Sequence, residues 1–210
     1  AARWTRSGSP TPDGSVVSAS SSAKHCSPPS PDDVLITLSG LPGSGTSTVA
    51  RTVASRLGIE HLDGGTVFRA MAAERGVSLA EFARIAEGDD AIDRALDDRL
   101  VQRAREGDVL LESRLAGWLA TRAALRGLRI WIHCDEVERA RRVGGRDGHD
   151  ADEALATNQE REASERTRYL TYYDIDLQDL SIYDLVVDST TTGPDAIVDQ
   201  IVAAAAHAAA

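Results

Sequence analysis

Short apolar runs alternate with amphipathic stretches of helical periodicity from residue 33 onward. The runs are five or six residues long and rich in Val, Leu and Ile, as in strands that are buried on both faces. The stretches between them have the apolar spacing of helices. The predicted strands are Val34–Ser39, Ile59–Asp63, Asp108–Glu112, Leu128–His133 and Asp184–Asp188. The predicted helices cover about residues 46–57, 65–75, 78–87, 90–106, 135–143, 151–172 and 193–207.

This order of elements predicts an α/β fold. Strands that alternate with helices form a parallel sheet with helices on both faces, which makes three layers. Gly144, Gly145 and Gly148 interrupt one helical region, and glycine is a poor helix former. We therefore expect that helix to end near residue 143 and a flexible flap to follow it.

The first part of the chain differs from the rest. Residues 1–31 contain nine Ser and five Pro and almost no large apolar side chain, so they cannot build a core. We predict a disordered leader over residues 1–32 and one folded domain over residues 33–210. The alternative is a targeting or regulatory tail, for which Arg3 and Arg6 give little support.

The segment Val34–Thr48, VLITLSGLPGSGTST, leads from a strand through a glycine-rich turn into a helix. It fits the phosphate-loop pattern G-x-x-x-x-G-K-[ST] at Gly40, Gly45 and Ser47, but Thr46 stands at the lysine position. Glycines let backbone N–H groups converge on phosphate oxygens, and the helix N-terminus also favours anions. The Ser47 hydroxyl is placed to bind the Mg²⁺ that bridges two phosphates. The alternative is a glycine-rich turn without a ligand.

Polar residues follow the next two predicted strands, where doubly wound sheets bind ligands. Asp63 and Arg69 follow the second strand, and Arg114 follows the third. Arg69 lies about one helical turn after Gly65, so it can reach back to a second phosphate that Arg114 can also grip. The alternative for each arginine is a surface salt bridge.

Thr46 cannot neutralise phosphate charge, so other cations are needed. Arg142 follows the fourth strand, and the polar segment 160–169 carries Arg161, Glu165 and Arg168 close to one helical face. Such a segment is either a solvated helix stitched by ion pairs or a mobile cationic cover for a transferring phosphoryl group. The missing lysine favours the second interpretation, a mobile cationic helix over the phosphoryl group.

The charge balance is unusual. The 210 residues carry a net charge of −10, 22 of the 23 basic residues are Arg, and Asp (21) outnumbers Glu (12). Such a surface is typical of proteins in concentrated salt, although a GC-rich genome also favours Arg. At about 1 M salt the Debye length is roughly 3 Å, so only direct arginine contacts hold an anion. The negative charge argues against nucleic acid as the main partner.

The two cysteines, Cys26 and Cys134, form no disulfide framework and lack a CxxC partner, which suits a reducing cytoplasm. We do not expect a metal site at His133-Cys134-Asp135, because consecutive strand residues point in alternating directions. No apolar run approaches the roughly 18 residues that span a membrane. We therefore expect a cytoplasmic protein with no membrane partner.

Several segments together resemble cytidylate kinases of the archaeal type, over about residues 33–205. They are ITLSGLPGSGTSTVA, HLDGGTVFR, LLESRLAGWLA, EREASERTRYLTYY and LSIYDLVVDST. In that branch threonine at the lysine position is not unusual, so Thr46 is consistent with membership of the family. The resemblance implies a nucleoside monophosphate kinase with a P-loop domain over 33–210, a five-stranded parallel sheet and a mobile lid.

The resemblance also implies residue roles. Asp63, Arg69 and Arg114 match the monophosphate site. Arg161-Glu162-x-x-Glu165-x-x-Arg168 is similar to an Arg-Asp-x-x-Asp-x-x-Arg pattern of bacterial relatives, whose arginines stabilise the transferred phosphate; Glu in place of Asp leaves the acidic roles open. The double glycine departs from a continuous lid helix and makes Arg142 a better candidate than Arg146. ATP would bind at Gly40, Leu41, Pro42, Gly43, Ser44, Gly45, Thr46, Ser47 and Thr48, with Ser47 nearest Mg²⁺.

We therefore expect a monomer that phosphorylates CMP or dCMP with ATP and Mg²⁺. One alternative keeps the fold and changes the acceptor to another monophosphate or a small alcohol. Another is a nucleotide-binding module without catalysis, because Thr46 lacks charge. The arginines argue against that module, since a pure binder needs neither a second phosphate grip nor a cationic lid.

Overall fold

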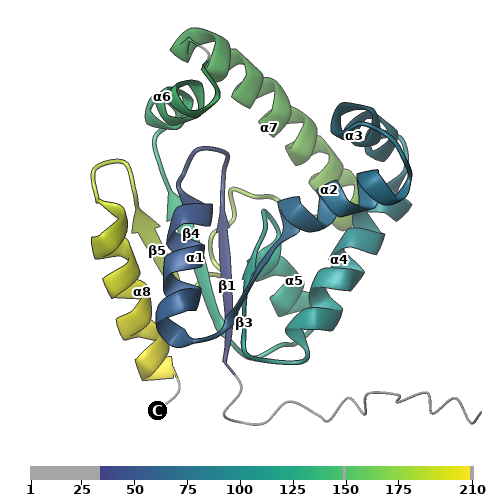
Figure 1. The fold of residues 1–210 in the computed structure, drawn as a ribbon. Helices are drawn as coiled ribbons and strands as arrows, with labels where there is room; N and C mark the ends of the chain where they lie inside the picture. The colour runs from purple at the N-terminus through teal and green to yellow at the C-terminus, as the bar shows by residue number, and fades with distance from the viewer. Residues whose placement is uncertain (1–33, 149, 209–210) are drawn as a thin grey trace, which may run out of the picture.

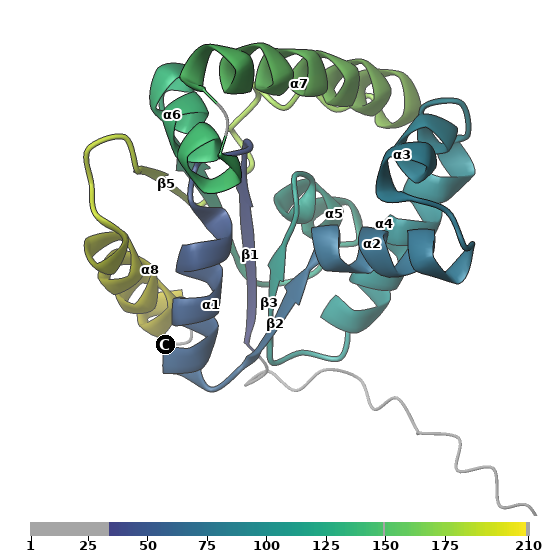
Figure 2. The same ribbon diagram turned by 45° about the horizontal axis from the view of Figure 1, so that its top comes forward.

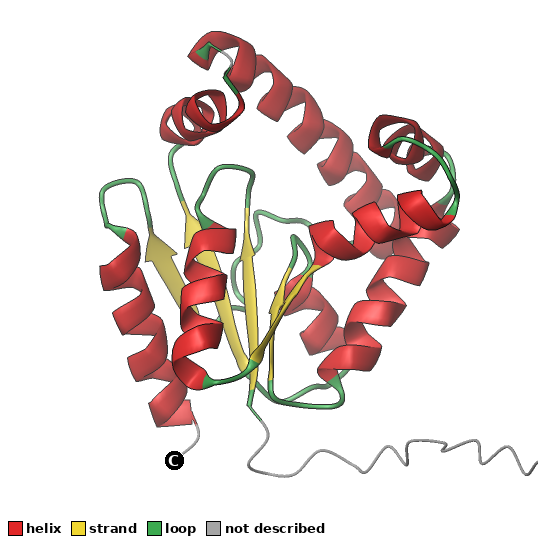
Figure 3. Ribbon diagram, in the orientation of Figure 1, coloured by secondary structure: helices red, strands yellow, loops and turns green. Residues whose placement is uncertain are grey.

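The computed structural model describes residues 34–148 and 150–208. Its five strands form one sheet, which lies at the centre of the fold (Figure 3). All strands are parallel, in the order β2-β3-β1-β4-β5. The strands are β1 (Leu35–Gly40), β2 (Glu60–Asp63), β3 (Val109–Glu112), β4 (Leu128–His133) and β5 (Leu185–Asp188). Each predicted strand is confirmed, with its ends shifted by at most one residue. The predicted leader lies outside the described residues.

Eight helices occur in the described part of the chain. They are α1 (Thr46–Leu57), α2 (Gly64–Glu74), α3 (Leu79–Glu87), α4 (Asp90–Ala104), α5 (Ala116–Arg122), α6 (Glu136–Asp147), α7 (Ala151–Tyr173) and α8 (Pro194–Ala208). Seven correspond to predicted helices, whereas the sequence pattern does not predict α5. That helix has only seven residues, and four of them are buried, so it lacks a polar face with a visible period.

The expected break at the double glycine is wrong. α6 continues through Gly144 and Gly145 to Asp147 and ends at Gly148, whose φ is 76°. Gly144 is buried, and α6 packs along α7. Tertiary packing of this kind outweighs the poor helix preference of glycine, which is about 1 kcal/mol per residue. The expected flap is instead a pair of packed helices.

Helices cover both faces of the sheet, which confirms the three-layer α/β fold (Figure 1). On one face, α1 and α8 enclose an apolar core with the strands. Its main residues are Ile36, Leu38, Val49, Val53, Leu110, Ile130, Ile132, Val187, Ile197 and Ile201. On the other face, α4, α5 and the segment after α7 pack over Leu35, Val109 and Leu111. β1 is buried along its whole length because its side chains alternate between the two cores.

Several helices lie beyond the carboxyl edge of the sheet (Figure 2). α7 crosses above the strand ends from α6 towards α3 (Figure 2). α2, α3 and α4 share a smaller apolar cluster around Phe82, with Met71 and Ile92. Ligands of doubly wound sheets bind at this edge. Among the described residues, no helix is long and apolar enough to cross a membrane.

Candidate active site

The phosphate loop forms the turn between β1 and α1. Gly43 and Gly45 have φ angles of 85° and 88°, a left-handed conformation that residues with a Cβ rarely adopt. The first N–H groups of α1 have no partner within the helix, as at any helix N-terminus, and no side chain caps them at Gly45. Backbone N–H groups arranged in this way form a concavity that binds anions.

Close packing on both sides holds the loop in shape. A Cβ on Gly40 would lie 2.9 Å from the carbonyl oxygen of Ile132, and a Cβ on Gly43 would lie 2.6 Å from that of Arg139. Ser44 is 1% exposed, and its hydroxyl has no hydrogen-bond partner among the described residues. A buried hydroxyl without a partner is costly, and a phosphate oxygen is a group that it can bind.

Ser47 lies in the first turn of α1 and faces the end of β3. Its hydroxyl donates a hydrogen bond of 2.6 Å to Oε1 of Glu112, whose Oε2 lies 2.8 Å from Nε2 of His61 on β2. A hydroxyl and a carboxylate at the base of a phosphate loop are oxygen ligands that suit Mg²⁺. The described residues contain no group of three His, Cys, Asp or Glu side chains that could hold a metal.

Arg142 of α6 lies at the other side of the loop. Its guanidinium donates to the carbonyl oxygen of Ser189 at 2.6 Å and pairs with Glu138 at 2.8 Å. The Ser189 hydroxyl donates in turn to the carbonyl oxygen of Ser44 at 2.8 Å. A cavity of about 290 Å³, lined in part by Gly45 and Arg142, opens here. The structure therefore brings this predicted arginine to the phosphate loop.

Asp63 and Arg69 meet at the start of α2. The Asp63 carboxylate accepts hydrogen bonds from the N–H groups of Gly65 and Thr66, at 2.9 and 3.1 Å, and so caps the helix. Arg69 donates to the Thr66 hydroxyl at 2.7 Å and to Asp63 at 3.2 Å. Partial burial opposes ionisation of Asp63, but its hydrogen bonds and Arg69 hold its pKa below the ordinary value. Asp63 thus orients Arg69, whose side chain is 57% exposed.

Arg114 connects the phosphate loop to α7. Its Nη1 donates to the carbonyl oxygen of Gly40 at 2.9 Å, and its Nε pairs with Glu165 at 3.0 Å. Glu165 is 6% exposed and also pairs with Arg161 at 2.9 Å. Burial alone would raise the pKa of Glu165, but Arg114 and Arg161 outweigh it and lower that pKa. The predicted residues Arg114 and Arg161 are therefore joined through one buried carboxylate.

Arg168 does not join this group. Its Nη1 pairs with Asp93 of α4 at 3.0 Å, and its buried Nε has no partner among the described residues. Burial raises the pKa of Asp93 although Arg168 opposes that shift. Arg168 thus ties α7 to α4 in this structure.

Arg139 and Glu162 form a link that the sequence pattern does not reveal. Arg139 is 4% exposed and donates to the carbonyl oxygens of Cys134 and Pro42, at 3.1 and 3.3 Å. It also forms a two-nitrogen ion pair with Glu162 of α7. The partner lies 23 residues further along the chain, so nothing local distinguishes Arg139 from the other arginines of α6.

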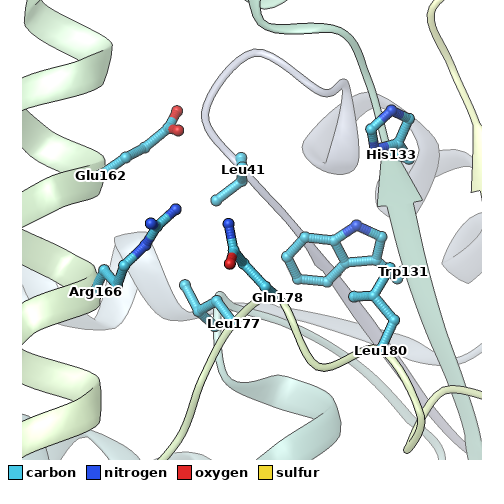
Figure 4. Close-up of a pocket in the computed structure, with 8 residues that line it drawn as sticks. All are labelled: Leu41, Trp131, His133, Glu162, Arg166, Leu177, Gln178 and Leu180. Atoms are coloured by element: carbon cyan, nitrogen blue, oxygen red, sulfur yellow. The ribbon is translucent and has the colours of Figure 1, made fainter.

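A second cavity, of about 170 Å³, lies beside α7 (Figure 4). Leu41, Trp131 and Leu177 line it, and the side chains of Arg166 and Gln178 point towards its centre (Figure 4). Of the predicted site residues only Leu41 is among its lining residues. The cavity therefore adjoins the predicted phosphate loop at Leu41, and none of the predicted acceptor residues lines it.

Comparison with known proteins identifies close relatives. The model of the cytidylate kinase-like family matches residues 35–191. A cytidylate kinase of Halobacterium salinarum is 47% identical over 79% of this chain and 86% of its own length. One from Halorubrum lacusprofundi is 48% identical over 81% of this chain and 88% of its own, and one from Pyrococcus horikoshii is 43% identical over 84% and 90%.

Solved structures share the fold at much lower identity. A gluconokinase from Sinorhizobium meliloti superposes with a TM-score of 0.56 and 19% identity, over 85% of this chain and 94% of its own. A shikimate kinase from Acinetobacter baumannii, in complex with shikimate, has a TM-score of 0.55 and 15% identity, over 83% and 93%. At these identities the likeness establishes the P-loop α/β fold alone.

Proposed function

Because the chain belongs to the cytidylate kinase-like family, we propose that it transfers the γ-phosphoryl group of ATP to CMP or dCMP. The observation that carries the proposal is the contact between two candidate phosphate sites. Arg114, the candidate for the acceptor phosphate, donates to the carbonyl oxygen of Gly40 in the candidate ATP loop. Two phosphate sites this close suit direct transfer from one nucleotide to another.

In this proposal, residues 40–48 bind the triphosphate of ATP. The free N–H groups of α1 and the buried hydroxyl of Ser44 support that role. Arg142, fixed to Ser189 beside the loop, supplies charge that lysine would otherwise supply. Ser47 and Glu112 would hold Mg²⁺, directly or through water molecules. The ion would supply positive charge against the phosphate oxygens.

The acceptor phosphate binds to Arg69 and Arg114. Arg69 is exposed and already oriented by Asp63, which acts here through the arginine. Arg114 has a further nitrogen, Nη2, without a hydrogen-bond partner among the described residues. A guanidinium with a free N–H edge suits a phosphate, because two parallel hydrogen bonds fix its orientation.

The reaction is a direct in-line displacement. An oxygen of the CMP phosphate forms a bond to the γ-phosphorus while the bond to the bridging oxygen breaks, and ADP leaves. The attacking oxygen is anionic near neutral pH, so no general base is needed. Arg142, Arg161 and Arg168 neutralise the charge that is transferred, and α7 excludes water from above. For Arg168 this role requires exchange of its partner Asp93 for the phosphate.

A coupled assay of ADP release tests the proposal. The purified chain is mixed with ATP, Mg²⁺ and either CMP, dCMP, UMP or AMP, at low and at molar KCl. We expect turnover with CMP and dCMP. A preference for UMP or AMP would show that the acceptor is that monophosphate and not CMP or dCMP. Silence with every acceptor, in a folded protein that binds ATP, would favour a non-catalytic module or an acceptor outside the nucleotides.

The proposal also includes a monomer in a reducing cytoplasm. Cys134 is a free, buried thiol, which suits such a compartment. Light scattering during size-exclusion chromatography measures the mass in solution, and a dimer would contradict this part of the proposal.

A further inference from the structure

The side chain of Glu112, at the end of β3, bonds to one residue of α1 and one residue of β2. Its Oε1 accepts a hydrogen bond of 2.6 Å from Ser47, and its Oε2 lies 2.8 Å from Nε2 of His61. A carboxylate can only accept, so His61 is the donor and carries its proton on Nε2. The side chains of Glu112 and His61 are 7% and 18% exposed. Hydrogen bonds shielded from water in this way are stronger and better defined than exposed ones.

The strand register explains why this histidine reaches the carboxylate. His61 of β2 pairs with Leu110 of β3, and side chains of a strand alternate between its two faces. His61, Leu110 and Glu112 therefore point to one face of the sheet. Leu110 packs in the core under α1, so this is the face that Ser47 also meets. His61 is the diagonal cross-strand neighbour of Glu112, within reach of its side chain.

We propose that His61 is a positioning residue of the metal site. It holds the Glu112 carboxylate in the orientation that meets the Ser47 hydroxyl, and it acts through Glu112 without touching the nucleotide. The inference rests on the proposed function, because it requires Mg²⁺ beside Ser47. Partners that orient metal-binding groups typically change metal affinity or activity by about 10- to 100-fold.

The position of His61 also predicts what it does not affect. The one hydrogen-bond partner that the described residues give the His61 side chain is Glu112, so no such bond joins His61 to the phosphate loop. The acceptor candidates Arg69 and Arg114 are held by Thr66 and by Glu165. Loss of the His61 donor should therefore weaken the metal-dependent part of nucleotide binding and leave the metal-free part and the acceptor site intact.

Calorimetric titration with ADP, with and without Mg²⁺, tests the inference on the full chain. His61→Met removes the donor, whereas His61→Gln offers an amide N–H in place of Nε2–H. His133→Met is the matched control, because His133 lies at the end of β4, is 52% exposed and lies 3.7 Å from Asp135, with no bond to Glu112 or Ser47. In each protein the measured quantity is the gain in ADP affinity on addition of Mg²⁺.

We expect His61→Met to reduce this gain about tenfold and to leave the affinity for metal-free ADP unchanged. His61→Gln should keep most of the gain, and His133→Met all of it. In the kinase assay, His61→Met should lower kcat and raise the Mg²⁺ concentration at half-maximal rate, while the KM for CMP stays within about twofold.

Three outcomes would overturn the inference. The first is that His61→Met retains the full gain. The second is that His61→Met also loses metal-free ADP binding, which is the pattern of a packing defect. The third is that His61→Gln loses as much of the gain as His61→Met, which would show that the N–H donor at position 61 is not what matters. Failure of the proposed function is distinct from these, because the unmodified protein would then show no gain with Mg²⁺ or no turnover of CMP.

Discussion

Thr46 begins α1 at the position where the usual phosphate-loop pattern has lysine. Its hydroxyl and N–H can donate to a phosphate, but they add no charge. Three guanidinium groups hydrogen-bond at or beside the loop instead, and one of them is Arg139, which donates to the carbonyl oxygen of Pro42. Arg114 donates to the carbonyl oxygen of Gly40, and Arg142 reaches the loop through Ser189. A guanidinium stays charged at any working pH and has a rigid fork, so lysine is a poor substitute for it.

Arg114→Lys is therefore expected to damage the acceptor site. A lysine ammonium is a point charge without the planar fork, so it cannot keep the geometry of the bonds to Glu165 and Gly40 and also offer a paired N–H edge to a phosphate. Thus kcat/KM for CMP should fall about 100-fold while the KM for ATP changes less than about threefold. Steady-state kinetics with each substrate varied measures both. Arg103→Lys is the control, because Arg103 pairs with Glu60 at the opposite end of β2. Unchanged CMP kinetics would remove Arg114 from the acceptor site.

The residues of the proposed metal site differ in how far the sequence reveals them. Ser47 follows from the spacing of the phosphate-loop pattern alone. Glu112 leaves a weaker signal, as a charged residue at the end of an apolar strand. His61 leaves none, because its bond to Glu112 depends on the register of two strands and joins residues 51 positions apart.

At the scale of elements, α7 is the helix that joins the parts of the site. Glu162 pairs with Arg139 of α6, Glu165 with Arg114 after β3, and Arg168 with Asp93 of α4. The sequence leaves open whether this polar helix is solvated or covers a site. The burial of Glu165 decides against a purely solvated helix, since a surface ion pair would leave that carboxylate in water.

Removal of one charge from the link between α6 and α7 should destabilise the protein. Glu162→Gln leaves the buried guanidinium of Arg139 without its counter-charge, at a cost of roughly 3 kcal/mol. A chain of this size should then melt about 6 to 12 °C lower, as measured by calorimetry. Glu160→Gln, at an exposed position of the same helix, serves as the control. Equal melting temperatures for the two variants would contradict the role of this pair.

Asp97 of α4 should make stability depend on pH. Burial raises its pKa to about 7, the nearby Asp93 and Asp98 contribute to the rise, and its Oδ2 has no hydrogen-bond partner among the described residues. The folded protein therefore keeps a proton that the unfolded chain loses above about pH 4. The contribution of Asp97 to stability must fall as the pH rises from about 4 to about 7, by on the order of 2 to 4 kcal/mol.

Asp97→Asn tests this dependence. Urea unfolding of both proteins between pH 4.5 and 8 should show that the variant gains stability relative to the original as the pH rises. The comparison of the two proteins cancels the opposite contribution of carboxyls such as Asp63 and Glu165, whose pKa values are lowered. A difference that does not vary with pH would rule out a buried, protonated Asp97.

Helices and strands were predictable from the sequence where they have a clear hydrophobic periodicity. They were less predictable where tertiary packing determines whether a helix forms or where it ends. The five strands and seven helices have clear patterns. α5 is short and mostly buried, so it shows no polar face. The extent of α6 depends on its packing along α7, which a local pattern with two glycines cannot express.

For the whole molecule, the alternation of strands and helices predicts a parallel α/β sheet, but not its strand order. The order β2-β3-β1-β4-β5 depends on the side to which each crossover returns, and several orders satisfy the same pattern. The layers were therefore predictable, and the meeting of β2, β3 and β1 at one site needed the structure.

The net charge of −10 should make the whole molecule sensitive to salt. Between 0.1 and 2 M KCl the melting temperature should rise by about 5 °C, which corresponds to roughly 1 to 2 kcal/mol, because salt screens the repulsion among acidic side chains. Sucrose at equal osmolality is the control, since it does not screen charge. An equal rise with sucrose would show that excluded solute, and not screening, stabilises the protein.

The contact between Gly43 and the base of α6 has a consequence for chimeras and for sequence divergence. A Cβ at Gly43 would lie within 3.0 Å of three backbone atoms of Arg139. The phosphate loop and α6 also share the hydrogen bond from Arg139 to Pro42, across 97 positions of the chain. A substitution in one of the two segments that moves its backbone therefore requires a compensating substitution in the other. A phosphate loop grafted from another kinase should fit only if the first turns of its own α6 are transplanted with it.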